Sequence, residues 1–382
     1  MMSPASLRVN HPASLVKNFV RGAKSCGKAS LLLALVLCLG CSGPVDKRPA
    51  ATVPVYYATT RKVEPEAVPE KAFTAAISAQ KGARHGRVLV EVRGVKARIV
   101  SYDPPLAGKE LFPTRFHTEV RSQISSSHPL IAYVHGYNNT FATAAHRAAI
   151  FAHNLQPDVA PRPVIYSWPS ASKVLAYARD EDTALLNQEN IRRFLNDLHG
   201  SDETTPVVLM GHSLGARSLT YALRDIFLFR AGGGGFHSIP KQPMFAHLVL
   251  LEPDVNRLYF RQNLLRASRL CGRITVYASR RDLALGASRF VHGGHYRLGQ
   301  EIRGHTDPSL NEPIPAYIAK KIDIIDASAV RSDLFGHAYD QPVLFEDLRA
   351  VIRGKKVTER EGYTLEKDST GKFYRLLAKP RV

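Results

Sequence analysis

The sequence predicts an α/β protein with a mostly parallel sheet flanked by helices. Two observations lead to this prediction. Beyond Pro129, short apolar runs of strand length alternate with longer stretches of helical character, which is typical of a parallel sheet. One of these runs ends in the tight turn Gly-His-Ser-Leu-Gly at 211–215. The 382 residues are 45% apolar and 22% charged, enough for one large domain with additions and a real core.

The first 40 residues predict a targeting signal. Basic residues precede the uncharged run 29–40, which is too short to span a bilayer comfortably but fits the core of a secretory signal. Gly40 and Cys41 close this run and resemble a bacterial lipoprotein signal, in which the cysteine is acylated and becomes the mature N-terminus. Cys38 stands where that pattern prefers Leu. An ordinary cleaved signal and an uncleaved anchor remain alternatives.

Cysteine usage and charge agree with export to the cell envelope, on the periplasmic side. Only Cys271 lies beyond the signal and its lipidation cysteine, which excludes a disulfide framework and a cysteine zinc site. Removing the five basic residues before Cys41 lowers the formal charge from +19 to +14. Such a surface is attracted to anionic envelope lipids, whereas no basic-aromatic motif indicates nucleic acid. We expect membrane attachment through a lipid anchor, no cofactor and no obligate protein partner.

The mature chain begins with β structure. Residues 41–52 are a Pro/Ala/Lys/Arg tether, and Val53–Thr59 has the β-branched and aromatic composition of a strand. Residues 87–101 alternate apolar and polar on both sides of Gly94, which indicates a hairpin. We expect one domain over 53–350, followed by a charged hairpin extension over 351–382.

The central segment predicts six buried strands and the helices between them. The expected strands are Leu130–Val134, Val164–Ser167, Val207–Met210, His247–Leu251, Ile274–Ala278 and Ile322–Ile325. The expected helices cover approximately 140–155, 171–199, 214–230, 257–270 and 283–291. Ligands of open α/β sheets bind at the carboxyl ends of the strands, so we expect the chemistry there.

The turn at 211–215 indicates a nucleophilic serine. It matches G-x-S-x-G with a strand before it and a helix after it, the context that gives this pattern its meaning. Gly211 and Gly215 let neighbouring chain pass close by, and Ser213 is expected in a strained backbone conformation. The amide of Leu214 then points at the atom that the hydroxyl attacks.

A serine nucleophile needs a base, and the base needs a carboxylate to orient it. In enzymes with this elbow the chain order is serine, acid, histidine. Asp282 follows the strand that begins at Ile274, and His337 lies on a glycine-containing loop after the last strand. We therefore expect the triad Ser213–Asp282–His337. Asp254 ends the preceding strand and is the alternative acid, and Asp282 also fits a helix N-cap.

The oxyanion of the tetrahedral intermediate needs two donors. The Leu214 amide is one. The loop His135-Gly136-Tyr137 follows the first buried strand, and Gly136 permits close approach, so the Tyr137 amide is the second candidate. Trp168 follows the next strand and is a candidate for the wall of the substrate pocket. Residues 179–182 concentrate carboxylates without histidines at ligand spacing, so a helix-start or ion-pair role is favoured over a metal site.

The combined motifs resemble a group of bacterial α/β-hydrolases that forms a family of unknown function and is described as esterases or lipases. The match covers about 53–350. It is carried by residues 55–59, 134–139, 166–170, 179–182, 211–215, 252–254, 277–285, 325–328 and 336–337. Leu214 and Ala216 differ from the Met and the small polar residue that many members have. The resemblance implies the α/β-hydrolase fold and the triad above, and it supplies no substrate.

Together these observations predict a serine hydrolase that cleaves a small-molecule ester or lipid through an acyl-enzyme. The triad alone does not choose the leaving group, so a thioesterase or amidase remains an alternative. A non-catalytic envelope lipoprotein that uses the fold as a binding module is the alternative from another class.

Overall fold

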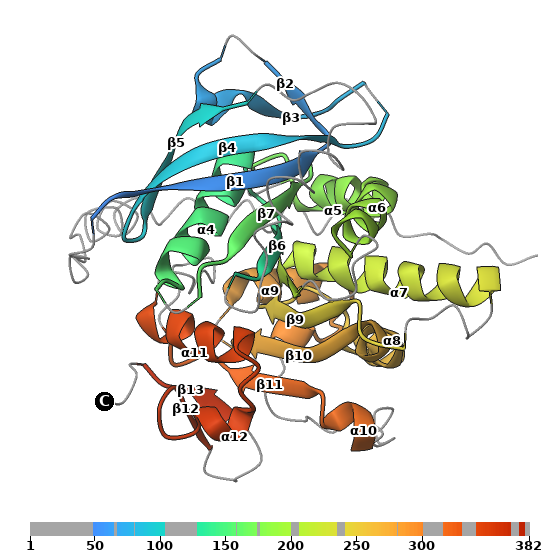
Figure 1. Ribbon diagram of the computed structural model, residues 1–382. Coiled ribbons are helices and arrows are strands. Elements are labelled where there is room, and N and C mark those ends of the chain that lie inside the picture. The colour runs from blue at the N-terminus through green and yellow to red at the C-terminus, as the bar shows by residue number, and fades with distance from the viewer. Residues whose placement is uncertain are drawn as a thin grey trace, which may run out of the picture. The chain divides into compact units, whose positions relative to one another are not determined.

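The computed structural model describes residues 49–64, 67–79, 81–103, 128–157, 159–173, 176–199, 206–234, 241–280, 282–300, 316–330, 341–367 and 374–378. Within these residues an eleven-stranded sheet runs through the protein in the order β12-β13-β11-β10-β9-β8-β6-β7-β1-β4-β5 (Figure 1). The strands are β1 (Ala51–Thr59), β4 (Arg84–Arg93), β5 (Lys96–Tyr102), β6 (Leu130–Val134), β7 (Arg162–Ser167), β8 (Val207–His212), β9 (Phe245–Leu251), β10 (Cys271–Ala278), β11 (Ile322–Asp326), β12 (Leu365–Lys367) and β13 (Tyr374–Leu376).

All pairs from β1 through β7, β6, β8, β9, β10 and β11 to β13 are parallel, whereas β4, β5 and β12 pair antiparallel at the two ends. The six predicted apolar runs are the six central strands. The hairpin around Gly94, which has φ 62°, and the C-terminal strand pair are also confirmed. The short sheet of β2 (Arg61–Val63) and β3 (Phe73–Ile77) was not expected, because residues 63–86 show no clear period.

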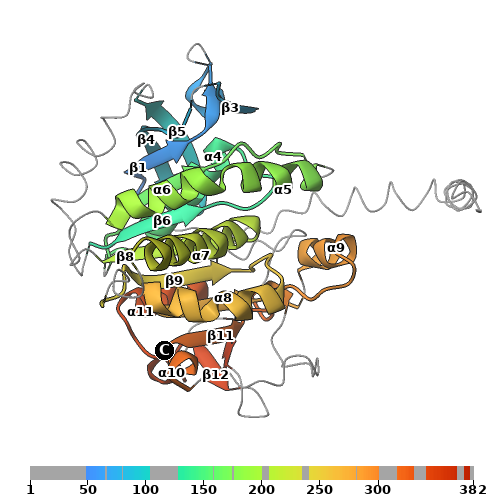
Figure 2. The same ribbon diagram turned by 90° about the vertical axis from the view of Figure 1, so that its right-hand side faces the viewer.

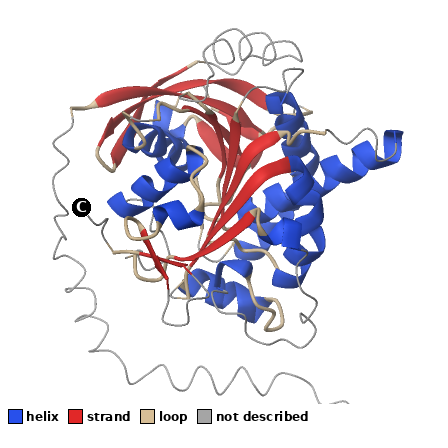
Figure 3. Cartoon of the chain, turned by 60° about the horizontal axis from the view of Figure 1, so that its bottom comes forward, coloured by secondary structure: helices blue, strands red, loops and turns tan. Residues whose placement is uncertain are grey.

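Helices cover both faces of the sheet, as predicted (Figures 2 and 3). They are α4 (Phe141–Asn154), α5 (Tyr177–Leu186), α6 (Gln188–His199), α7 (Leu214–Gly234), α8 (Arg257–Leu270), α9 (Leu283–Val291), α10 (Ala316–Ala319), α11 (Pro342–Ile352) and α12 (Val357–Arg360), with short 3-10 turns η2 (Pro69–Lys71) and η6 (Leu298–Gln300). One apolar cluster lies between the sheet and α4 and α11, and a second lies between the sheet and α6, α7 and α8.

The expected helix over 171–199 is two helices. The buried Asn187 separates them: its Oδ1 accepts hydrogen bonds from Thr60 Oγ1 at 2.5 Å and from Tyr166 Oη at 2.9 Å. These long-range partners are invisible to local periodicity, so the sequence did not predict the break. No helix in the described part of the chain is long and apolar enough to cross a membrane.

Candidate active site

Ser213 occupies a strained turn between β8 and α7. Its φ is 49°, in the left-handed region that residues with a side chain rarely adopt, and such strain is common at functional sites. The strand ends at His212 and the helix begins at Leu214, so a single residue reverses the chain. The strained conformation expected from the sequence is present.

The surrounding backbone holds this turn in place. Ser213 N donates to Leu251 O at 3.0 Å, and Ser213 O accepts from Asp254 N at 3.2 Å and Ala216 N at 3.0 Å. A Cβ on Gly215 would overlap the carbonyl oxygens of Val134 and His135, so only glycine fits there. These contacts over-determine the turn, which is how a strained residue persists.

The Leu214 amide lies at the N-terminus of a long helix, where the first N–H groups have no partner within the helix. The helix dipole makes this end favourable for negative charge. The position of α7, as well as the single amide, therefore favours negative charge beside Ser213.

The loop after β6 passes directly over Ser213. A Cβ on Gly136 would lie 2.9 Å from Ser213 Cβ and 2.8 Å from His212 Nδ1, so the loop can approach this closely only without a side chain there. The next amide, that of Tyr137, is thereby brought to the same edge of the sheet as Leu214. The two amides expected to form the oxyanion hole lie on elements that meet at Ser213.

Asp282 follows β10 and caps α9. It is 5% exposed, and its Oδ1 accepts a hydrogen bond from Leu285 N at 2.9 Å. The N-cap that the sequence indicated is therefore present. A capping carboxylate has a second oxygen that can orient a histidine, so the cap and the proposed catalytic role are compatible.

Asp254 is embedded in a buried network. It is 1% exposed; its Oδ1 lies 3.2 Å from Arg297 Nε and accepts from Ser288 Oγ at 2.8 Å. Its Oδ2 lies 3.1 Å from Arg217 Nη2 and accepts from Tyr177 Oη. Burial raises the pKa of Asp254, but the two arginines and two hydroxyls outweigh it and hold that pKa below its usual range. Both oxygens are thus occupied by groups that fix them.

The acidic segment 179–182 forms the start of α5 and joins this network. Glu181 pairs with Arg217 and lies 2.8 Å from His292 Nε2. Asp180 accepts from Asn138 N at 3.1 Å and from Ala171 N at 2.6 Å. The ion pair of Glu181 is one of the two roles that the sequence favoured, whereas Asp180 binds loop amides and does not cap the helix start. No group of three or more metal-ligating side chains occurs among the described residues.

Trp168 is fully buried, with 0% of its surface exposed. Its ring stacks on that of His135 at 4.9 Å between centroids, and its Nε1 donates to His135 O at 2.9 Å. The structure therefore puts Trp168 behind the loop that crosses Ser213, and not at an open cleft where the substrate-pocket prediction had it.

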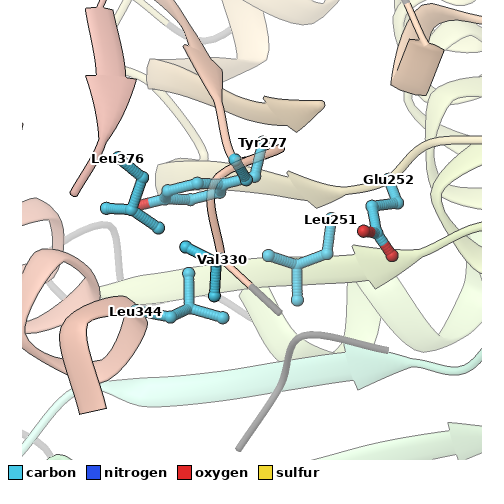
Figure 4. Close-up of a pocket in the computed structure, with 7 residues that line it drawn as sticks. Leu251, Glu252, Tyr277, Val330, Leu344 and Leu376 are labelled. Atoms are coloured by element: carbon cyan, nitrogen blue, oxygen red, sulfur yellow. The ribbon is translucent and has the colours of Figure 1, made fainter. Parts of the chain in front are cut away.

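Two predicted residues, His337 and Cys41, lie outside the described residues. Val330 and Leu344, on either side of the segment that contains His337, line one pocket together with Leu251, Glu252 and Tyr277 (Figure 4). The pocket lies at the carboxyl ends of β9, β10 and β11. Leu251 also connects it to Ser213, because its carbonyl accepts from Ser213 N.

Sequence reasoning missed Glu252 as a residue of this region. It has φ 43°, is 4% exposed, and donates its N–H to Tyr277 O at 2.8 Å. Its carboxylate lies at one end of the mostly apolar pocket in Figure 4. The available signal was its position directly after β9, at the carboxyl end where the sequence analysis expects the chemistry, but it was not named as a site residue.

Residues 113–344 match the family described as alpha/beta hydrolase of unknown function, DUF900. This match covers more than half of the chain and confirms both the predicted fold and the family resemblance. No curated protein matches the sequence.

Several solved structures are similar to the chain at low identity. An acetylxylan esterase has 11% identity and a TM-score of 0.32, covering 60% of this chain and 97% of its own. ESTFA in its iron-lacking apo form has 12% identity and a TM-score of 0.23, covering 73% and 82%. The peroxisomal α/β-hydrolase Lpx1 of Saccharomyces cerevisiae has 12% identity and a TM-score of 0.20, covering 54% and 44%.

Proposed function

Because the chain belongs to the alpha/beta hydrolases of unknown function, we propose that it is a serine hydrolase that cleaves carboxylic esters. One observation supports this most: Ser213 has a left-handed φ of 49° between a strand and a helix, and Gly136 lies against its Cβ. A serine that only packs in a core needs neither the strained turn nor a glycine loop across it.

In the proposed reaction Ser213 Oγ attacks the ester carbonyl carbon while its proton passes to His337. The carbonyl oxygen becomes an oxyanion that accepts from the Tyr137 and Leu214 amides. The carbon–oxygen bond to the alcohol then breaks, and His337 returns the proton to the departing oxygen. Water repeats the sequence with the acyl-enzyme, releasing the acid and restoring Ser213.

We assign the orienting acid to Asp282 and not to Asp254. An orienting carboxylate must present an oxygen to the histidine, and all four hydrogen-bonding and ionic contacts of Asp254 already fix both of its oxygens. Asp282 Oδ1 accepts from the Leu285 amide as the cap of α9, a contact that is compatible with orienting a histidine. The strand after which it occurs, β10, also fits the serine–acid–histidine order.

The substrate we propose is a small-molecule ester or a lipid, with no cofactor. The proposed setting is the periplasmic side of the envelope, with the chain anchored through acylated Cys41.

The test is hydrolysis of a panel of esters across acyl chain lengths, with Ser213→Ala and a matched control. Ser268→Ala removes another buried serine hydroxyl, one that donates to Leu265 O on α8 away from the site. We expect turnover with wild type and Ser268→Ala and none with Ser213→Ala. Folded wild-type protein that hydrolyses no ester, thioester or amide would favour the binding-module alternative.

A further inference from the structure

The carbonyl of Gly136 is held from one side by two donors. His135 Nδ1 lies 2.8 Å from Gly136 O, and Asn139 Nδ2 donates to the same oxygen at 3.2 Å. This carbonyl belongs to the same peptide unit as the Tyr137 N–H. Because a trans peptide is planar, its N–H points opposite to its C=O. Fixing the carbonyl therefore fixes the direction in which the Tyr137 amide points.

The contact with Gly136 O determines where His135 carries its proton. A carbonyl oxygen only accepts, so Nδ1 must be the protonated nitrogen. His135 is completely buried, and this burial, together with the charge of Arg61, lowers its pKa to about 3. The ring is therefore neutral at ordinary pH, and Nε2 has no proton and must accept.

Ser167 and Arg61 complete this arrangement on the other side of the ring. Ser167 Oγ lies 3.2 Å from His135 Nε2 and accepts from Arg61 Nε at 2.9 Å. Because Nε2 carries no proton, it accepts from the Ser167 hydroxyl, whose oxygen in turn accepts from Arg61. The hydrogen bonds thus run in one direction, from Arg61 through Ser167 and His135 to Gly136 O.

Arg61 also holds the loop directly. It is 1% exposed; its Nη2 donates to Asn139 O at 2.8 Å and its Nη1 donates to Thr74 O at 3.1 Å. Burial lowers the pKa of Arg61 to about 9, with the charge of Asp180 opposing, so the side chain stays charged at neutral pH. A charged guanidinium bonded at all three of its nitrogens thus holds Ser167 Oγ and the loop carbonyl in place.

From this geometry we propose that His135 is a positioning residue of the oxyanion hole, held as its Nδ1–H tautomer by Gly136 O and by Ser167, which Arg61 keeps in place. It acts through the Gly136–Tyr137 peptide and does not touch the substrate. The inference rests on the proposed function of Ser213, because an oxyanion forms there only if Ser213 attacks a carbonyl. Trp168 supports the arrangement by stacking on the His135 ring.

The kinetic test compares His135→Ala with His135→Asn. The amide nitrogen of asparagine lies near the position of imidazole Nδ1, so the asparagine variant keeps the donor and the alanine variant loses it. We expect His135→Ala to lower kcat about 10- to 100-fold with KM within about threefold, because losing an oxyanion donor outright costs about 100- to 1000-fold. His135→Asn should retain kcat within about threefold.

The chain contains a matched control. His247 is also buried and has a pKa lowered to about 3 by burial and nearby Arg273, and its Nε2 lies 2.9 Å from Thr275 Oγ1 in the middle of the sheet. His247→Ala should lower the melting temperature and leave kcat of the folded protein unchanged. Equal kcat in His135→Ala and wild type would overturn the proposal and make His135 merely structural.

A second measurement does not depend on the variants folding. In wild type labelled with ¹⁵N-histidine, NMR should show His135 as a neutral ring protonated at Nδ1 between pH 5 and pH 8. A ring protonated at Nε2, or one that titrates in this range, would overturn the proposal. Failure of the proposed function is a different result: wild type would then neither turn over esters nor react with a fluorophosphonate.

Discussion

Changing Asp254 to asparagine is predicted to lower stability but not activity, whereas changing Asp282 to asparagine is predicted to lower activity but not stability. Asp254→Asn removes the charge that Arg217 and Arg297 share in a buried site. Breaking a buried ion pair costs about 3–5 kcal/mol. At 2–4 °C per kcal/mol, the melting temperature should fall by roughly 6–20 °C. Asparagine caps a helix as well as aspartate does, so Asp282→Asn should cost less than about 0.5 kcal/mol.

Turnover should be affected in the reverse order, with the larger loss in Asp282→Asn. Asp282→Asn should lower kcat by about 10⁴-fold, because an asparagine favours the wrong tautomer of the base. Asp254→Asn, assayed well below its melting temperature, should retain most of its turnover. The assays are ester hydrolysis and thermal unfolding by circular dichroism. An Asp254→Asn protein with unchanged melting temperature and abolished turnover would refute the reasoning and make Asp254 the orienting acid.

The same carboxylate gives a pH dependence with a definite sign. The pKa of Asp254 is lower in the folded protein than its ordinary value near 4. Its contribution to stability is therefore complete above about pH 4 and is lost as the pH falls through the folded pKa. The difference in melting temperature between wild type and Asp254→Asn should be largest near pH 7 and shrink in acid.

The remaining predictions concern the elbow, the tryptophan and the anchor. Gly215→Ala should destabilise by about 3 kcal/mol or more and abolish turnover, because its Cβ would meet two backbone carbonyls; an active variant with the wild-type melting temperature would contradict this packing. Trp168→Phe should lower stability by about 1–3 kcal/mol, because it leaves the His135 carbonyl without its donor. A shifted preference for acyl chain length at unchanged melting temperature would instead support a role of Trp168 in the wall of the substrate pocket. Cys41→Ser should move the protein from the membrane fraction to the soluble fraction in fractionated cells, and equal membrane association of the two forms would contradict lipid anchoring.

The parallel sheet and the elbow were predictable because both depend on local sequence. Apolar runs of strand length alternated with helical stretches, and the glycines at 211 and 215 flanked the serine. The turn at Ser213 needs a close backbone approach that only glycine allows, so the five residues 211–215 are enough to predict it. Residues such as Leu251, which fixes the elbow through one carbonyl, leave no such local mark.

The networks behind the site could not be read from the sequence. Asp254 and Arg297 are separated by more than forty residues and meet because the loop after β9 is hydrogen-bonded to η6, with Val255 O accepting from Leu298 N. Arg61 reaches Ser167 and Asn139 from a strand that the sequence analysis did not predict. A buried charged residue can be identified only from the residues that pair with it, and the tertiary fold determines which residues these are. The sequence therefore favoured Asp282 and kept Asp254 as the alternative acid, and it did not reveal how different their surroundings are.

The central claim is that Ser213 is the nucleophile, and covalent labelling tests it most directly. Purified mature protein is treated with a fluorophosphonate, digested, and the modified peptide is identified by mass spectrometry. We predict one adduct, on Ser213, and no adduct in Ser213→Ala of the same fold by circular dichroism. Folded wild type without an adduct, or an adduct that persists in Ser213→Ala, would contradict the account.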